Sequence, residues 1–106
     1  MARYLVIGSY TPEGAKGVLK EGGSGRRDAA RTAIESVGGT LEAFYFGFGS
    51  DDWYVIADLP DHSSAAAVGL TVGATGTSRA RTIVLLTPEE VDAATRMSPS
   101  FRPPGG

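Results

Sequence analysis

The single histidine of the chain, His62, is the side chain best suited to acid–base chemistry near neutral pH. A carboxylate can orient an imidazole as a general base, and Asp61 and Asp58 lie close to His62 in the sequence. The candidate catalytic residues are His62 and Asp52. However, His62 follows Asp61 where a strand should turn into a helix, and aspartate is a common helix cap. We therefore expect a structural corner at His62, with general-base catalysis as the alternative.

A glycine-rich segment, residues 22–27, leads into a predicted helix and could bind an anion. Backbone N–H groups at a helix start attract anions, and the candidate anion-binding side chains are Ser24, Arg26 and Arg27. The segment is not a Walker loop, because Gly23-Ser24 stands where that loop needs Lys-Ser/Thr. The alternative is a flexible connection followed by a solvated basic helix face.

Metal-ion and thiol chemistry find little support in the sequence. Asp51 and Asp52 could bind a cation, but no further ligands with a recognisable spacing accompany them. The absence of cysteine excludes disulfides, thiolate nucleophiles and iron–sulfur clusters. We expect neither a metal nor a cofactor.

Several aromatic side chains could line a ligand pocket between a sheet and its helices. The helix predicted at residues 63–74 has mostly small side chains, which leave room for a small aromatic or apolar ligand. Tyrosine hydroxyls would serve as polar contacts in such a pocket. The alternative is that the aromatic side chains fill the core or an interface. The candidate pocket residues are Tyr10, Tyr45, Trp53 and Tyr54.

Periodicity and turn residues predict the elements that position these side chains. Thr-Pro-Glu at residues 11–13 and again at 87–89 predicts two helix starts, and residues 30–37 show helical spacing of apolar side chains. The order β-α-β-β-α-β is typical of the ferredoxin-like α+β arrangement, a four-stranded antiparallel sheet with helices on one face. The predicted strands are residues 4–10, 41–48, 53–59 and 79–86, and the predicted helices are 12–20, 25–37, 63–74 and 88–97.

Two features of these helices should shape the packing. Gly69 and Gly73 lie one turn apart, which predicts a close approach of another backbone. In the first helix, Ala15, Val18 and Leu19 are expected on the inner side.

Both faces of the predicted strands are mainly apolar, although a sheet with one face in water should alternate apolar and polar residues. The uncovered face would be an apolar patch larger than monomers usually expose. We therefore expect a homo-oligomer assembled through the sheet face. The alternative is a monomer whose own C-terminal segment lines that face. In the second strand, the pattern places Phe44, Phe46 and Phe48 on one face and Leu41, Ala43 and Tyr45 on the other.

Length and charge bound the remaining possibilities. The 106 residues are enough for one domain, expected at residues 1–95, followed by a flexible Pro/Gly-rich tail at 96–106. The net charge of −2 gives no basic excess, so we expect no nucleic-acid partner. No apolar run approaches the roughly 20 residues of a membrane span, so we expect no membrane association and a cytoplasmic location.

Three segments together resemble the GYD domain family. They are Tyr4–Gly17 with its Tyr-Thr-Pro-Glu-Gly run, Gly38–Phe46 together with Gly49, and Leu85–Glu90. The resemblance implies a ferredoxin-like fold of the dimeric α/β-barrel group, in which two sheets pair face to face. In the Gly-Tyr-Asp signature of the family, Asp52 matches the aspartate, and Asp51 stands where the family has tyrosine.

Two classes of function fit these observations. The first is a small oligomeric structural or ligand-binding protein of the GYD family. The alternative is a small cofactor-independent enzyme, similar to a monooxygenase or isomerase, with its pocket between sheet and helices. The sequence has no strong nucleophile–base pair and no metal-ligand set, which favours the first class.

Overall fold

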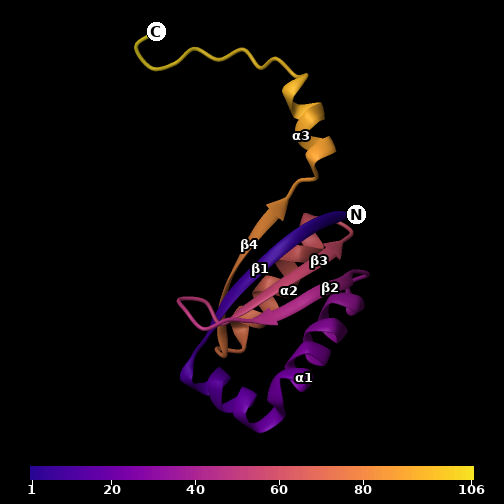
Figure 1. Cartoon of the computed structure of the whole chain (residues 1–106), viewed down its shortest axis with the longest axis vertical. Coiled ribbons are helices and arrows are strands. Elements are labelled where there is room, and N and C mark those ends of the chain that lie inside the picture. Colours follow the sequence, from indigo (N-terminus) through magenta and orange to yellow (C-terminus); the bar gives the residue numbers. More distant parts are fainter.

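The computed structural model describes all 106 residues and has an α+β architecture. The strands are β1 (Ala2–Tyr10), β2 (Thr40–Phe46), β3 (Trp53–Leu59) and β4 (Ser78–Leu85), and the helices are α1 (Pro12–Ser36), α2 (His62–Ala74) and α3 (Pro88–Thr95). The strands form one antiparallel sheet in the order β2-β3-β1-β4. This order is compatible with the predicted ferredoxin-like arrangement, with α1 and α2 on the same side of the sheet (Figure 1).

Helix α1 starts at the predicted signal and bends at one glycine. The Thr11 hydroxyl caps the helix by accepting a hydrogen bond from the Gly14 N–H at 3.3 Å. Gly22 has a φ of 79°, a left-handed conformation that favours glycine, and the two halves of α1 diverge there. The interruption predicted between the helices at 12–20 and 25–37 is therefore confined to Gly22. Leu19, predicted on the inner side, is exposed, because the first half of α1 runs past the end of the sheet (Figure 1).

The core lies between the helices and one face of the sheet. Buried and half-buried residues alternate along β3, as expected for a strand with one face packed on helices. The buried cluster consists of Tyr4, Ile34, Trp53, Val55, Ala57, Leu59 and Ala65.

A β-bulge in β2 moves one side chain to the core face. Leu41 pairs with Ala57, but Ala43 already pairs with Ile56, so Glu42 is the extra residue. Leu41 consequently packs against the core, and its predicted placement on the same face as Ala43 is wrong.

The close backbone approaches occur at other glycines than the sequence predicted. A Cβ at Gly69 or Gly73 would meet no atom within 4 Å, so the predicted close contact along α2 is wrong. A Cβ at Gly14 would instead overlap the carbonyl oxygen of Thr77, and one at Gly8 would overlap the side-chain ring of Trp53. Helix α2 therefore does not press closely on its neighbours at its glycines.

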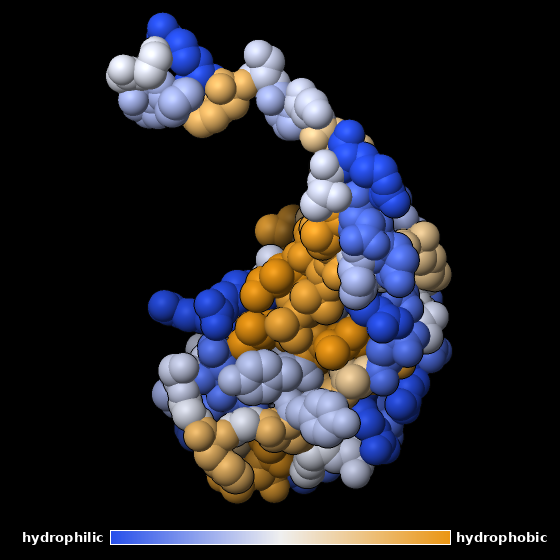
Figure 2. Space-filling view, turned by 45° about the horizontal axis from the view of Figure 1, so that its top comes forward, coloured by the Kyte–Doolittle hydropathy of each residue, from blue (hydrophilic) through white to orange (hydrophobic).

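The opposite face of the sheet is covered by no helix, and we call it the open face. Figure 2 shows apolar side chains gathered over the sheet between charged ones. Arg3 and Asp58 form an ion pair at this face at 3.0 Å, and the hydrogen bond from Arg3 lowers the pKa of the Asp58 carboxyl. Arg81 and Asp51 form another at 3.1 Å. The apolar and aromatic side chains of the open face are Leu5, Ile7, Ala43, Tyr45, Tyr54, Ile56, Ile83 and Leu85.

Helix α3 projects beyond the end of β4 and packs on neither face of the sheet (Figure 1). A capping box between Thr87 and Glu90 defines its start, at the predicted Thr-Pro-Glu signal. Residues 96–106 contain no helix or strand. None of the three helices combines the length and the apolar character needed to span a membrane.

Candidate functional site

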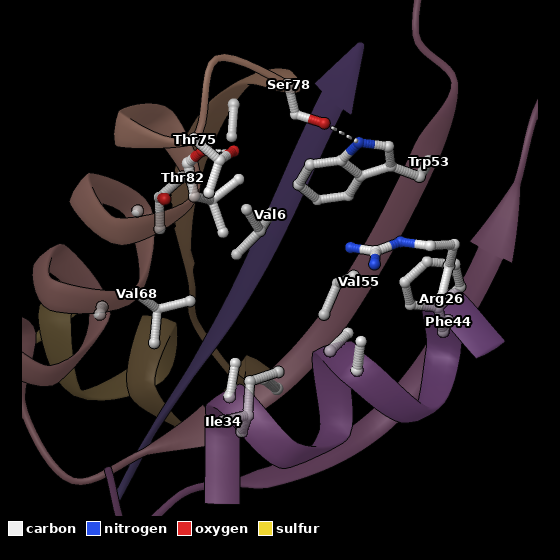
Figure 3. A pocket seen from close by; sticks show the side chains of 18 of the residues that line it. Val6, Arg26, Ile34, Phe44, Trp53, Val55, Val68, Thr75, Ser78 and Thr82 are labelled. Atoms are coloured by element: carbon white, nitrogen blue, oxygen red, sulfur yellow. Dashed lines mark hydrogen bonds between the residues drawn. The ribbon is translucent and has the colours of Figure 1, made fainter. Parts of the chain in front are cut away.

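A cavity of about 160 Å³ lies between the core face of the sheet and helices α1 and α2. Fifteen of its 21 lining residues are hydrophobic, so its interior favours apolar contents. Figure 3 shows Val6 and Val55 contributed by the sheet, Ile34 by α1 and Val68 by α2.

Small side chains on both helices explain why this space is not filled. The second half of α1 presents Ala29, Ala30 and Ala33 to the cavity, and α2 presents Ala65 and Gly69. These side chains are too short to meet across the gap, and the kink in α1 sets the direction of its second half. The cavity lies where the small residues of the predicted 63–74 helix indicated room.

Arg26 is the only charged residue that lines the cavity. In Figure 3 its side chain lies near those of Trp53 and Phe44. Its Nη1 atom donates a hydrogen bond to Glu21 Oε2 at 3.2 Å. Burial raises the pKa of the Tyr10 hydroxyl, and the positive charge of Arg26 opposes that rise. One end of a mainly apolar cavity thus carries a positively charged side chain.

Hydroxyl groups line another part of the wall, where α2 meets β4. Trp53 Nε1 donates to Ser78 Oγ at 3.4 Å, and the Thr75 and Thr77 hydroxyl oxygens lie 2.6 Å apart. Thr82 adds a further hydroxyl (Figure 3). These groups can donate or accept hydrogen bonds, so this wall can contact a polar atom without adding charge.

The four predicted pocket residues divide between the two faces of the sheet. Tyr10 and Trp53 line the cavity. Tyr45 and Tyr54 form a cross-strand pair on the open face, where Tyr45 is 68% exposed. The structure therefore brings only the first pair to the cavity.

The three predicted anion-binding residues also separate. Arg26 reaches the cavity, whereas Ser24 is exposed and lies outside the lining. Arg27 pairs with Asp28 at 3.2 Å on the outer side of α1. The glycine-rich segment is helical apart from Gly22, so it forms no loop around an anion.

Asp52 connects the β2–β3 turn to β1. Its carboxylate accepts a hydrogen bond from the Tyr10 backbone N–H at 2.7 Å, and its own N–H donates to the Gly8 carbonyl at 2.8 Å. Both bonds fix the turn against the strand. Asp51, which stands in the tyrosine position of the signature, pairs with Arg81.

His62 begins helix α2 and lies near the hydroxyl of Tyr4. The Tyr4 oxygen and His62 Nδ1 are 2.6 Å apart, and Tyr4 is 1% exposed, so His62 satisfies a buried hydroxyl. The side chain of Asp61 caps α2 by accepting from the Ser64 N–H at 2.8 Å. Tyr4 and His62 also line a second, shallower hollow beside Thr82.

Tyr4 and Glu21 are two contacts of the candidate residues that the sequence did not indicate. Tyr4 is 58 positions from His62, and only the pairing of β1 with β3 brings them together. Glu21 meets Arg26 across the kink, at a spacing of five that straight helices do not bring together. The side-chain types of Tyr4 and Glu21 alone did not indicate that they contact the candidate site residues.

The chain has no group of three or more histidine, aspartate or glutamate side chains that could hold a metal ion. The geometry instead defines a small α+β protein with an apolar cavity that has one cationic end. The sequence profile of the GYD domain matches residues 4–95, so this chain belongs to the GYD domain family. Neither the curated proteins nor the solved structures contain a match.

Proposed function

We propose that this GYD protein binds a small apolar or aromatic molecule in the cavity between α1, α2 and the sheet. The observation that carries this proposal is the 160 Å³ volume lined by mainly apolar side chains. An apolar protein cavity of about 150 Å³ can bind benzene, so a single ring is the appropriate size of ligand. The aromatic side chains of Trp53 and Phe44 supply surfaces against which such a ring can pack.

We further propose that two copies assemble through their open faces. Supporting this, Ile83 is 40% exposed and Tyr45 is 68% exposed although both lie on the sheet. Helix α3 leaves this face uncovered, and an apolar surface of this kind is usually covered by a partner. Such pairing would leave the cavity on the outer side of each sheet.

The ligand proposal is tested by titrating benzyl alcohol, followed by the NMR signals of residues around the cavity. We expect saturable shifts in the unmodified protein and their loss in Gly69→Leu, because Gly69 lines the cavity. Gly73→Leu is the matched control, since Gly73 is in the same helix, meets open space and does not line the cavity. Saturable binding that survives in Gly69→Leu would contradict the proposed location, and no saturable shifts in the unmodified protein would contradict the function.

A second candidate is a cofactor-independent enzyme that uses His62 as a proton-transfer group. The observation favouring it is the 2.6 Å contact with the Tyr4 hydroxyl beside the second hollow. It is tested by deuterium exchange from D₂O into the methyl group of acetophenone, followed by NMR. Exchange faster than in buffer, and reduced roughly a hundredfold in His62→Ala, would support catalysis. Exchange no faster than in buffer would leave His62 with its structural role.

A further inference from the structure

We infer that the ligand of this cavity is an organic acid with one ring, whose carboxylate binds Arg26. This inference rests on the proposed function and names its ligand class. It follows from the position of the one charged group of the lining, which stands at the edge of a space otherwise bounded by apolar and neutral side chains.

The position of Arg26 suits recognition of a ligand. Its guanidinium lies near the Trp53 ring and Phe44 (Figure 3), so a ring placed in the cavity would bring a substituent close to it. A guanidinium has five N–H donors in a planar fork that matches a carboxylate. Within the chain its Nη1 atom donates to Glu21, and the Tyr10 hydroxyl also interacts with the guanidinium. The remaining donors can therefore bind a further anionic group.

The charge of Arg26 also discriminates among ligands. A cationic amine would be repelled, and a neutral molecule would gain nothing from the guanidinium. The volume of 160 Å³ accommodates about one ring, which excludes larger polycyclic acids. A ring with a single carboxylate satisfies both the charge and the size.

Glu21 is the ion-pair partner of Arg26 within the chain. Its side chain is 47% exposed, lies before the Gly22 kink and is not part of the lining. Exposed ion pairs of this kind contribute little free energy, so a ligand carboxylate can compete with Glu21 for the guanidinium. Glu21 thus acts as a weak internal competitor, and its removal should strengthen binding of the acid.

The charge preference is tested with benzoate and with benzyl alcohol, its neutral counterpart, in the full-length protein. Arg26→Gln should weaken benzoate binding roughly tenfold and leave benzyl alcohol binding nearly unchanged, because only benzoate loses a charge-assisted hydrogen bond. Arg27→Gln is the matched control, because it removes the same charge at the adjacent position. The Arg27 side chain pairs with Asp28 and does not line the cavity. Arg27→Gln should change neither affinity.

A second variant changes Glu21, the other partner of the Arg26 ion pair. Glu21→Gln should raise benzoate affinity by up to about fivefold and leave benzyl alcohol unaffected. Glu35→Gln, an exposed change on the same helix, should do neither. If Arg26→Gln does not fold, Glu21→Gln still tests whether the ligand carboxylate binds Arg26.

The outcomes distinguish failure of the inferred Arg26–carboxylate contact from failure of the proposed ligand-binding function. The role of Arg26 alone is overturned if benzyl alcohol binds in the cavity and benzoate affinity is equal in the unmodified protein, Arg26→Gln and Glu21→Gln. If neither probe binds the unmodified protein, the proposed ligand-binding function fails as well. Weaker benzoate binding in Arg26→Gln and tighter binding in Glu21→Gln would support the inference.

Discussion

The two faces of the sheet have similar apolar content and different surroundings. On the core face, α1 packs mainly on β2 and α2 on β4, Trp53 and Leu59 are buried, and a cavity of about 160 Å³ remains. On the open face no element of the chain covers Ile56 or Ile83. An apolar surface that is partly covered gives an internal space for a small molecule, whereas an uncovered one gives a surface for a partner.

The difference originates in the helices. Their alanines and glycines are too small to fill the space above the core face, so covering that face still leaves room. The open face is bordered by ion pairs such as Arg3–Asp58 and Arg81–Asp51, which suit a polar rim around an apolar centre.

The largest expected effect is on the packing of the core face. Gly14→Ala places a Cβ against the Thr77 carbonyl oxygen, so it should lower the free energy of unfolding by about 3 kcal/mol. Gly17→Ala, in the same half of α1 but facing open space, should instead be neutral or stabilising by up to about 1 kcal/mol. Urea denaturation of both variants measures this. Equal stabilities would mean that the start of α1 is not packed as described.

The next effect tests the open face. Ile83→Lys puts a charge into the proposed contact between two copies and should raise the dissociation constant of the dimer at least about tenfold. Val84→Lys, on the adjacent residue but on the core side of β4, should leave association unchanged. Analytical ultracentrifugation of the three proteins gives the comparison. A protein of 11.0 kDa that sediments only as a monomer at micromolar concentration would contradict the assembly.

A smaller effect concerns the corner where α2 joins the core face. His62→Ala removes the partner of the buried Tyr4 hydroxyl and should cost about 1–2 kcal/mol of unfolding free energy. In the Tyr4→Phe background the same substitution should cost much less, and a double-mutant cycle by urea denaturation measures the coupling. Additive effects would show that the two side chains do not interact.

The smallest effect is the pH dependence contributed by the cap of α2. Hydrogen bonds from Ser64 lower the pKa of Asp61 below its ordinary value of 3.8. This contribution to stability is complete above that value and is lost as the pH falls through the lower pKa of the folded state. Asp61→Asn keeps a capping oxygen that does not titrate. Between about pH 5 and pH 2, thermal denaturation should show the unmodified protein losing slightly more stability than Asp61→Asn, and identical losses would contradict this account.

The order of the strands and of the main helices along the chain could be predicted from the sequence because local signals agree along the chain. The apolar runs between turn residues and the two Thr-Pro-Glu helix starts predicted the correct elements. The bulge at Glu42 could not be predicted, since Thr40–Phe46 contains no glycine or proline that would mark it. The contacts of Gly69 depend on how far α2 stands from its neighbours, which no local pattern encodes.

The candidate site was predictable only in part, because its residues are brought together by contacts that no local sequence pattern encodes. Arg26 was selected for its position in a glycine-rich segment, but its place at the cavity depends on the kink at Gly22. Tyr45 and Tyr54 have the same chemistry as Tyr10 and lie on the other face. Side-chain type indicates what chemistry a residue can perform, and strand register determines on which face of the sheet its side chain lies.

Crystals of the protein pressurised with xenon test the central claim most directly, because xenon occupies apolar cavities of this size. We expect xenon density between Val55, Val68 and Gly69 in the unmodified protein and none there in Gly69→Leu. A cavity closed by the protein's own side chains, or one that remains without xenon, would contradict the claim that the covered face of this sheet holds a ligand site.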